Sequence, residues 1–151
     1  MTAGMLTEPQ LDPMGALILE LRADADVAAL VDTRVRGYQP APGDALGPGE
    51  YRPFVVLQAL TVMPHARVPV TWAEYAVRTY GATPQGAWAV WGAVVKALHE
   101  VGHRTTTAGQ LFYKSIIVSG GTQDEDPDTH QPLVTGSVQL IASLQSVSIG
   151  S

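Results

Sequence analysis

The chain has 151 residues, of which 46% are hydrophobic and only 15% are charged, and its formal net charge is −5. A chain of this size and composition predicts a single domain with a real hydrophobic core. The negative charge disfavours non-specific binding to nucleic acid, and the absence of cysteine excludes disulfides and thiolate chemistry. The longest uncharged apolar run is too short to span a bilayer, and the N-terminus lacks a signal-peptide profile. We therefore expect a soluble protein made in the cytoplasm.

The first part of the chain predicts an arm followed by two helices. Residues 1–11 show no periodicity and are expected to form a flexible arm. Residues 12–22 predict the first helix, because an Asp-Pro pair at its start precedes apolar residues at helical spacing. Asp24 or Asp26 then caps a second, short helix. The residues of this short helix that are expected to point inward are Val27, Leu30 and Val31.

Residues 39–52 form a long loop rich in proline and glycine, which we expect to be either functional or a mobile surface excursion. Residues 53–62 follow as a strand that is apolar on both of its alternating faces. This pattern predicts a central position in the sheet, or a second face that something else covers. Residues 63–67 are expected to connect it to the next strand.

A strand followed by the longest helix occupies residues 68–100. Apolar residues alternate with polar ones from residue 71 to residue 79, which predicts a strand with one packed face. Gly81 ends this strand, Thr83 is suited to cap the helix, and Pro84 fits its first position. The helix carries an apolar stripe at helical spacing, made of Ala87, Val90, Trp91, Val94, Leu98 and Val101. The three tryptophans are predicted to be packing anchors, although Trp88 lies off the stripe and is suited to face a neighbouring subunit.

The C-terminal third predicts two strands around an acidic loop. Residues 111–118 form the first strand, and residues 120–132 form a second long loop with four carboxylates. Residues 134–143 show the clearest alternation in the chain, and residues 145–151 are expected to be a tail. The order of elements predicts an α+β fold, in which an antiparallel sheet of about four strands has helices packed on one face.

One short motif needs separate treatment, because residues 99–103 read HEVGH and match the zinc helix of metalloproteases. Both histidines lie away from the apolar stripe, Gly102 weakens the helix, and a third protein ligand is missing. We therefore favour two solvated histidines near the helix C-terminus, and a small zinc metalloprotease is the less favoured alternative. The acidic loop lacks the glycine and the distal glutamate of an EF-hand. We predict no catalytic, cofactor-binding or metal-binding residue.

Three segments, residues 20–44, 53–60 and 74–98, resemble the tail-terminator (tail-completion) proteins of long-tailed bacteriophages. The family has a short "DxxVxALV…RV" element, here ending at Arg34-Val35, and then a Pro/Gly-rich loop and a strand. It also has a "V…YG.TP..A" junction between a strand and a helix, which corresponds to the stretch from Val77 to Ala87. The resemblance covers the chain from about residue 12 to residue 142.

This resemblance implies a structural virion protein with no enzymatic activity and no cofactor. Its copies are expected to form a ring, a hexamer, at the head-proximal end of the tail tube. The ring would end tube polymerisation and provide the docking surface for the head–tail connector or stopper protein. Genomic DNA would pass through the lumen without specific binding, and no membrane is involved. Another phage neck or head–tail adaptor protein is the alternative.

The composition is compatible with such a ring. A low surface charge favours packing of sheet edges and loops against further copies of the same chain. Acidic loops repel phosphates, so they let a DNA duplex slide through a lumen without gripping it. We expect the protein to be assembled in the host cytoplasm and to reside in the virion.

Overall fold

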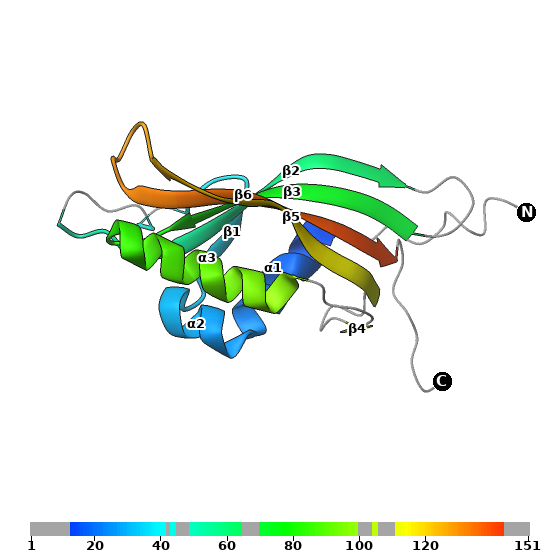
Figure 1. The fold of residues 1–151 in the computed structure, drawn as a ribbon. Coiled ribbons are helices and arrows are strands. Elements are labelled where there is room, and N and C mark those ends of the chain that lie inside the picture. The colour runs from blue at the N-terminus through cyan, green and yellow to red at the C-terminus, as the bar shows by residue number, and fades with distance from the viewer. Residues whose placement is uncertain are drawn as a thin grey trace, which may run out of the picture.

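A computed structural model describes residues 13–41, 43–44, 49–64, 70–99, 104–105 and 111–143 of the chain. Within these residues the helices and strands follow one another in the order shown in Figure 1. They are α1 (Pro13–Ala23), α2 (Ala25–Val31), β1 (Val35–Gly37), β2 (Phe54–Pro64), β3 (Val70–Tyr80), α3 (Pro84–Leu98), β4 (Arg104–Thr105), β5 (Leu111–Glu125) and β6 (Pro132–Ser143). The predicted N-terminal arm and the C-terminal tail lie outside the described residues.

The described strands form one six-stranded sheet in the order β1-β2-β3-β6-β5-β4. The short strand β1 runs parallel to β2, and all the other neighbouring pairs are antiparallel. The three helices lie together on one face of the sheet (Figure 1). The predicted α+β class with helices on one face is therefore confirmed. The four long strands match the predicted number, and β1 and β4 are short additions at the two edges.

The junction between β3 and α3 is built as the sequence predicts. Thr83 caps the helix, since its hydroxyl oxygen accepts a hydrogen bond of 3.0 Å from the Gly86 N–H, and Pro84 occupies the first turn. Gly81 stands where the strand touches the start of the helix. A Cβ atom at this position would lie 2.1 Å from the backbone nitrogen of Ala87. The close approach of these two backbones therefore depends on glycine.

The hydrophobic core lies between the helices and the sheet. The alternation on β3 is confirmed, because the residues of one parity are buried against the helices: Thr71, Ala73, Tyr75, Val77 and Thr79. The predicted stripe on α3 is buried as well: Ala87, Val90, Trp91, Val94 and Leu98. Val101, the last predicted member of the stripe, lies outside the described residues. Burial of these two faces in the core stabilises the fold.

The second helix begins at the first of the two predicted caps. The Asp24 carboxylate accepts hydrogen bonds from the backbone N–H groups of Asp26 at 3.0 Å and Val27 at 3.1 Å. Leu30, which was predicted to point inward, is 38% exposed. The prediction was wrong because Val27 and Val31 are four residues apart and lie in one row, whereas Leu30 falls on the flank of this short helix.

A second, smaller apolar cluster lies on the opposite face of the sheet, which we call the helix-free face. Its members are Phe54, Val56, Tyr80 and Leu133. The rings of Phe54 and Tyr80 stack with a centroid distance of 4.1 Å. Nearby, the side-chain amide of Gln131 donates to the Arg52 carbonyl at 2.8 Å. This cluster explains why the sequence of β2 is apolar on both faces at its start. Although β2 lies next to the edge strand β1, its residues Phe54 and Val56 are buried in the cluster on the helix-free face.

The predicted long loop at residues 120–132 is wrong, because β5 continues to Glu125 and leaves only residues 126–131 as the hairpin tip. One of the glycines at the start of this segment, Gly121, has a packing role in the strand. A Cβ atom at Gly121 would lie 2.7 Å from Nε1 of Trp91, and one at Gly136 would lie 2.1 Å from Cη2 of the same ring. These two glycines, one on β5 and one on β6, leave room for the Trp91 indole. Similarly, β2 continues through Pro64, into the predicted connection.

The predicted long loop at residues 39–52 is described only in part, at residues 39–41, 43–44 and 49–52. One of its residues, Asp44, is buried, and its carboxylate pairs with the Arg36 guanidinium at 3.0 Å. The same carboxylate accepts a hydrogen bond of 2.9 Å from the Ala41 N–H. This part of the loop is therefore fixed against strand β1.

Candidate assembly surface

Both edges of the sheet are only partly paired within the described residues. Strand β1 covers β2 only at residues 55–57, so no described strand lies beside β2 from Gln58 to Pro64. At the other edge, β4 covers β5 only at Leu111 and Phe112. The exposed edge of a strand presents rows of N–H and C=O groups to which a further strand can bind. Each described molecule thus has two open edges at opposite sides of the sheet.

The two edges differ in their side chains. The open part of β2 carries three exposed apolar residues: Leu60, Val62 and Met63, which are 53%, 49% and 61% exposed. The edge of β5 carries three irregularities in register, as well as the charged residue Lys114. Bulges and lysines are the usual protection of an edge against unwanted pairing. Strand β2 has a single irregularity, between Ala59 and Thr61, and is therefore the more exposed apolar edge.

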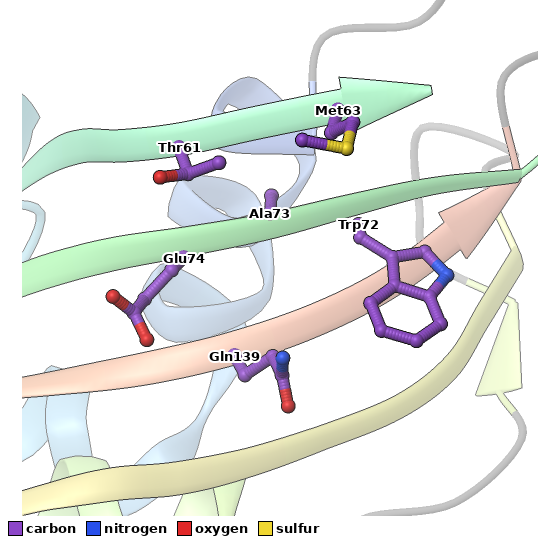
Figure 2. Close-up of a pocket in the computed structure, with 6 residues that line it drawn as sticks. All are labelled: Thr61, Met63, Trp72, Ala73, Glu74 and Gln139. Atoms are coloured by element: carbon purple, nitrogen blue, oxygen red, sulfur yellow. The ribbon is translucent and has the colours of Figure 1, made fainter. Parts of the chain in front are cut away.

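A shallow hollow of about 220 Å³ lies beside this edge, on the helix-free face (Figure 2). It is lined by Thr61 and Met63 of β2, by Trp72, Ala73 and Glu74 of β3, and by Gln139 of β6. The side chains labelled in Figure 2 come from three adjacent strands, and the helices lie behind these strands. We call this feature the hollow. Residues so far apart in sequence meet here because the register pairs Met63 with Trp72 and Glu74 with Gln139.

The tryptophans have three different roles. Trp91 is buried and is the packing anchor that the sequence predicts. Trp88 is 41% exposed, and its indole N–H donates to the Gln123 side chain at 3.0 Å. Trp72 is 49% exposed in the hollow, so its prediction as a packing anchor was wrong. An indole half exposed on a sheet face, next to an exposed methionine, is typical of a contact surface for another protein.

Of the HEVGH segment the structure describes only His99, and this residue lies just beyond the end of the helix in which a zinc site of this type would need it. Helix α3 ends at Leu98, and His99 is its C-cap with an extended backbone. The His99 Nδ1 atom accepts a hydrogen bond of 3.2 Å from the backbone N–H of Ile117. The remaining residues of the motif, 100–103, lie outside the described residues. In the part of the chain that the structure describes, no three His, Cys, Asp or Glu side chains are grouped to hold a metal ion.

We expect that replacing both His99 and His103 with alanine leaves folding and assembly unchanged. His99 is exposed, so the loss of its hydrogen bond should cost about 1 kcal/mol or less. The test is metal analysis by mass spectrometry of protein purified without added metal, for the original chain and the double variant. One zinc per chain that disappears in the double variant would contradict this prediction and revive the protease alternative.

The hairpin tip is organised by Asp126. Its carboxylate accepts hydrogen bonds from the N–H groups of Asp128 and Thr129, at 2.8 Å and 3.1 Å, and from the Tyr80 hydroxyl at 3.0 Å. Burial pushes the pKa of Asp126 upward, but these hydrogen bonds together outweigh it and lower its pKa below 3.8. Burial also raises the pKa of Tyr80 to about 12. The hydrogen bond between the Tyr80 hydroxyl and the Asp126 carboxylate fixes the hairpin tip to the smaller apolar cluster on the helix-free face, of which Tyr80 is a member.

The Tyr80→Phe variant is expected to raise the pKa of Asp126 and to lower stability by about 1 kcal/mol at neutral pH. Because the pKa of Asp126 is depressed in the folded state, its contribution to stability is present above pH 3.8 and is lost as the pH falls through the depressed value. An NMR titration of the carboxyl and urea denaturation measure both effects. Asp128→Asn is the control, since its exposed side chain should leave the Asp126 pKa almost unaltered. An unchanged pKa in Tyr80→Phe would refute this role of the hydroxyl.

The fold and this surface define an α+β protein whose sheet, as far as the described residues show, is covered by helices on one face and is partly unpaired at both edges. No family model and no curated protein matches the sequence. Among solved structures, the chain is similar to one from a structure described as "Virion of native gene transfer agent (GTA) particle". The TM-score is 0.63, and the similarity covers 87% of this chain and 94% of that chain, at 18% sequence identity. The two chains therefore share their fold over most of their length.

None of the helices within the described residues is long and apolar enough to cross a membrane.

Proposed function

We propose that this chain is a structural, non-catalytic protein of a phage-like virion. The observation that carries the proposal is the similarity of fold, over most of both chains, to a chain from a gene transfer agent virion. The role we propose is that of a tail terminator, which the resemblance of residues 20–44, 53–60 and 74–98 to that family supports. In this role the protein forms a ring at the head-proximal end of the tail tube, ends polymerisation of the tube and receives the head–tail connector.

The open sheet edges support a ring made by head-to-tail contacts. Strands β2, β3, β6 and β5 alternate in direction, so β2 and β5 run in opposite directions. A rotation about an axis along the strands would therefore place β2 of one subunit antiparallel to β5 of the next. Such an interface uses two different surfaces of the subunit, and it closes into a ring when the rotation closes. The apolar edge of β2 would be covered in this arrangement.

A ring would bring together one acidic hairpin from each subunit. Each copy contributes four carboxylates, from Asp124, Glu125, Asp126 and Asp128, at the end of the sheet where β5 turns into β6 (Figure 1). Together with the net charge of −5 per chain, this charge would repel the DNA backbone and let the genome pass without being bound. The hairpin would either line the lumen or form one rim of the ring.

Charge reversal at the hairpin tests this arrangement. In the variant Asp124→Lys, Glu125→Lys and Asp128→Lys, we retain Asp126 because it organises the tip. We expect rings to form, while DNA passage slows if the lysines line the lumen and connector docking fails if they lie on the rim. Infectivity and the counts of free tails and full heads measure the outcome. The neutral variant Asp124→Asn, Glu125→Gln and Asp128→Asn is the control, and normal infectivity of the lysine variant would refute both placements.

Loss of the gene product tests the proposed role itself. Particles assembled without the protein are expected to have tail tubes of uncontrolled length and heads that are not joined to tails, and supply of the intact chain should restore both. Electron microscopy of the assembly products measures tail length and joining. Tails of normal length that still fail to join would instead indicate another neck or head–tail adaptor protein. Normal, infectious particles would refute a virion role in assembly.

A further inference from the structure

The hollow contains a carboxylate whose charge is not neutralised by the rest of the described chain. Glu74 is partly buried on the helix-free face, and it forms no hydrogen bond or ion pair with another described residue. Its neighbours across the strands are Thr61 and Gln139, which are uncharged. The exposed indole of Trp72 and the thioether of Met63 complete the same hollow. A carboxylate beside an indole face and a flexible apolar side chain is suited to bind a cationic side chain.

A matching cation lies on the same face at the opposite edge of the sheet. Lys114 of β5 is exposed, and within the described residues it has no ion pair. The register pairs it with Ile141, and Ile141 with Trp72. Residues that are directly opposite in antiparallel strands project from the same face of the sheet. Lys114 and the hollow therefore share the helix-free face but stand at its two different edges.

The registers place Lys114 and the hollow at the same height along the strands. One row across the sheet runs Met63, Trp72, Ile141 and Lys114. If β5 of a second copy continues the sheet at the edge of β2, its Lys114 falls in the row of Met63. It then lies one strand, about 4.8 Å, from Met63 and two strands from Trp72, a distance that the long side chain of lysine can bridge across Met63. A stagger of two residues, of the kind that closure of a ring requires, moves Lys114 beside Thr61 and keeps it on the same face.

We propose that the hollow of each subunit binds the Lys114 side chain of the next subunit, against Trp72 and Glu74. This inference rests on the ring of the proposed function and identifies one contact between neighbouring subunits of that ring. The four-carbon stem of lysine would lie over Met63, while its ammonium group contacts the indole face and the Glu74 carboxylate. A volume of about 220 Å³ suits a single long side chain.

The contact would also give the interface its direction. Lys114 protects the edge of β5 against unwanted pairing, and only an edge that offers a complementary carboxylate compensates its charge. The hollow lies beside the edge of β2, and its Glu74 carboxylate is on the same face of the sheet as Lys114. Pairing of β5 with β5 would instead bring two lysines together, which is unfavourable. The pair thus favours head-to-tail contacts, which close into rings, over two-fold dimers.

Charge reversal in the full chain tests this contact. The single variants Glu74→Lys and Lys114→Glu are each expected to weaken ring association roughly 10- to 100-fold, because each places like charges together. The double variant should restore association, since it exchanges the two charges. An equimolar mixture of the two single variants should also form rings, with the variants alternating, because every interface then joins opposite charges. Sedimentation velocity over a range of concentrations measures all four samples.

The matched control is a charge exchange on the helix side. Lys96 and Asp26 form an exposed pair at 3.0 Å within one subunit, so Lys96→Glu combined with Asp26→Lys should leave ring association unchanged. If the original chain forms no rings, the proposed ring itself fails. If the original chain forms rings and the single variants do so equally well, or the double variant is not restored, the ring stands and the Lys114 contact is refuted. Variants that form normal rings but fail to join tails would show that the hollow binds another virion protein, which also refutes it.

Discussion

Replacing Gly81 with alanine is expected to destabilise the protein by about 3 kcal/mol or more. The added Cβ would lie 2.1 Å from the Ala87 nitrogen and 2.5 Å from the Gly86 carbonyl carbon, and both are backbone atoms that cannot rotate away. The first turn of α3 would have to move off β3, together with its cap at Thr83. Because this junction joins the helix to the centre of the sheet, the whole core would be affected. Urea denaturation at 25 °C measures the loss.

Gly92→Ala provides the matched control for this prediction. Gly92 is exposed in the middle of α3, and no atom lies within 4 Å of the position of an added Cβ apart from its chain neighbours and the backbone of its own helix. Alanine here should stabilise the protein by about 1 kcal/mol, because alanine favours the helix over the unfolded chain. Two alanine substitutions in the same region are thus expected to change stability in opposite directions. A cost below about 1 kcal/mol at Gly81 would mean that the strand and the helix do not approach as closely as described.

Introducing lysines at the open edge of β2 is expected to abolish assembly while the subunit still folds. Leu60 and Val62 are both about half exposed in the single subunit, so Leu60→Lys combined with Val62→Lys removes little from the core. Two charges on a strand edge oppose pairing with a further strand. The double variant should therefore sediment as a folded monomer under conditions where the original chain forms rings, and it should not complement loss of the protein in particles.

The control for the edge variant uses exposed leucines on the helices. Leu19 of α1 and Leu30 of α2 are 42% and 38% exposed, and they lie on helices that cover the other face of the sheet (Figure 1). Leu19→Lys combined with Leu30→Lys adds the same charge and should leave assembly intact. Circular dichroism and thermal unfolding verify that both double variants fold. Rings of the edge variant with the stability of the original chain would refute edge pairing.

The sequence predicted the elements whose signals are local. Thr83-Pro84 after Gly81 marks a strand stop and a helix start without reference to the rest of the chain, and the structure places them there. Alternation along β3 likewise predicted one packed face, and the stripe identified the buried face of α3. The short strand β1 was missed, because three residues are too few to show a period, and its pairing with β2 is parallel and non-local.

The predictions from the sequence were wrong where the role of a residue depends on a contact with residues that are distant in the sequence. Residues 120–132 were predicted to form a loop, whereas β5 continues through Gly120 and Gly121, and Gly121 leaves room for the indole of Trp91. The hollow could not be predicted either, because it joins residues of three strands that only the register brings together. Trp72 was wrongly predicted to be a packing anchor. The alternation of residues along β3 shows on which side of the strand Trp72 lies, but it does not show whether another element covers that side.

Negative-stain electron microscopy of the purified full chain tests ring formation most directly. Closed rings of uniform size, with subunits joined at the edges of β2 and β5, are the expected result at concentrations where sedimentation also detects association. The Leu60→Lys and Val62→Lys variant, imaged alongside, should show single subunits only. Images of the original chain that contain only single subunits or two-fold dimers, at every concentration tested, would contradict the proposed ring.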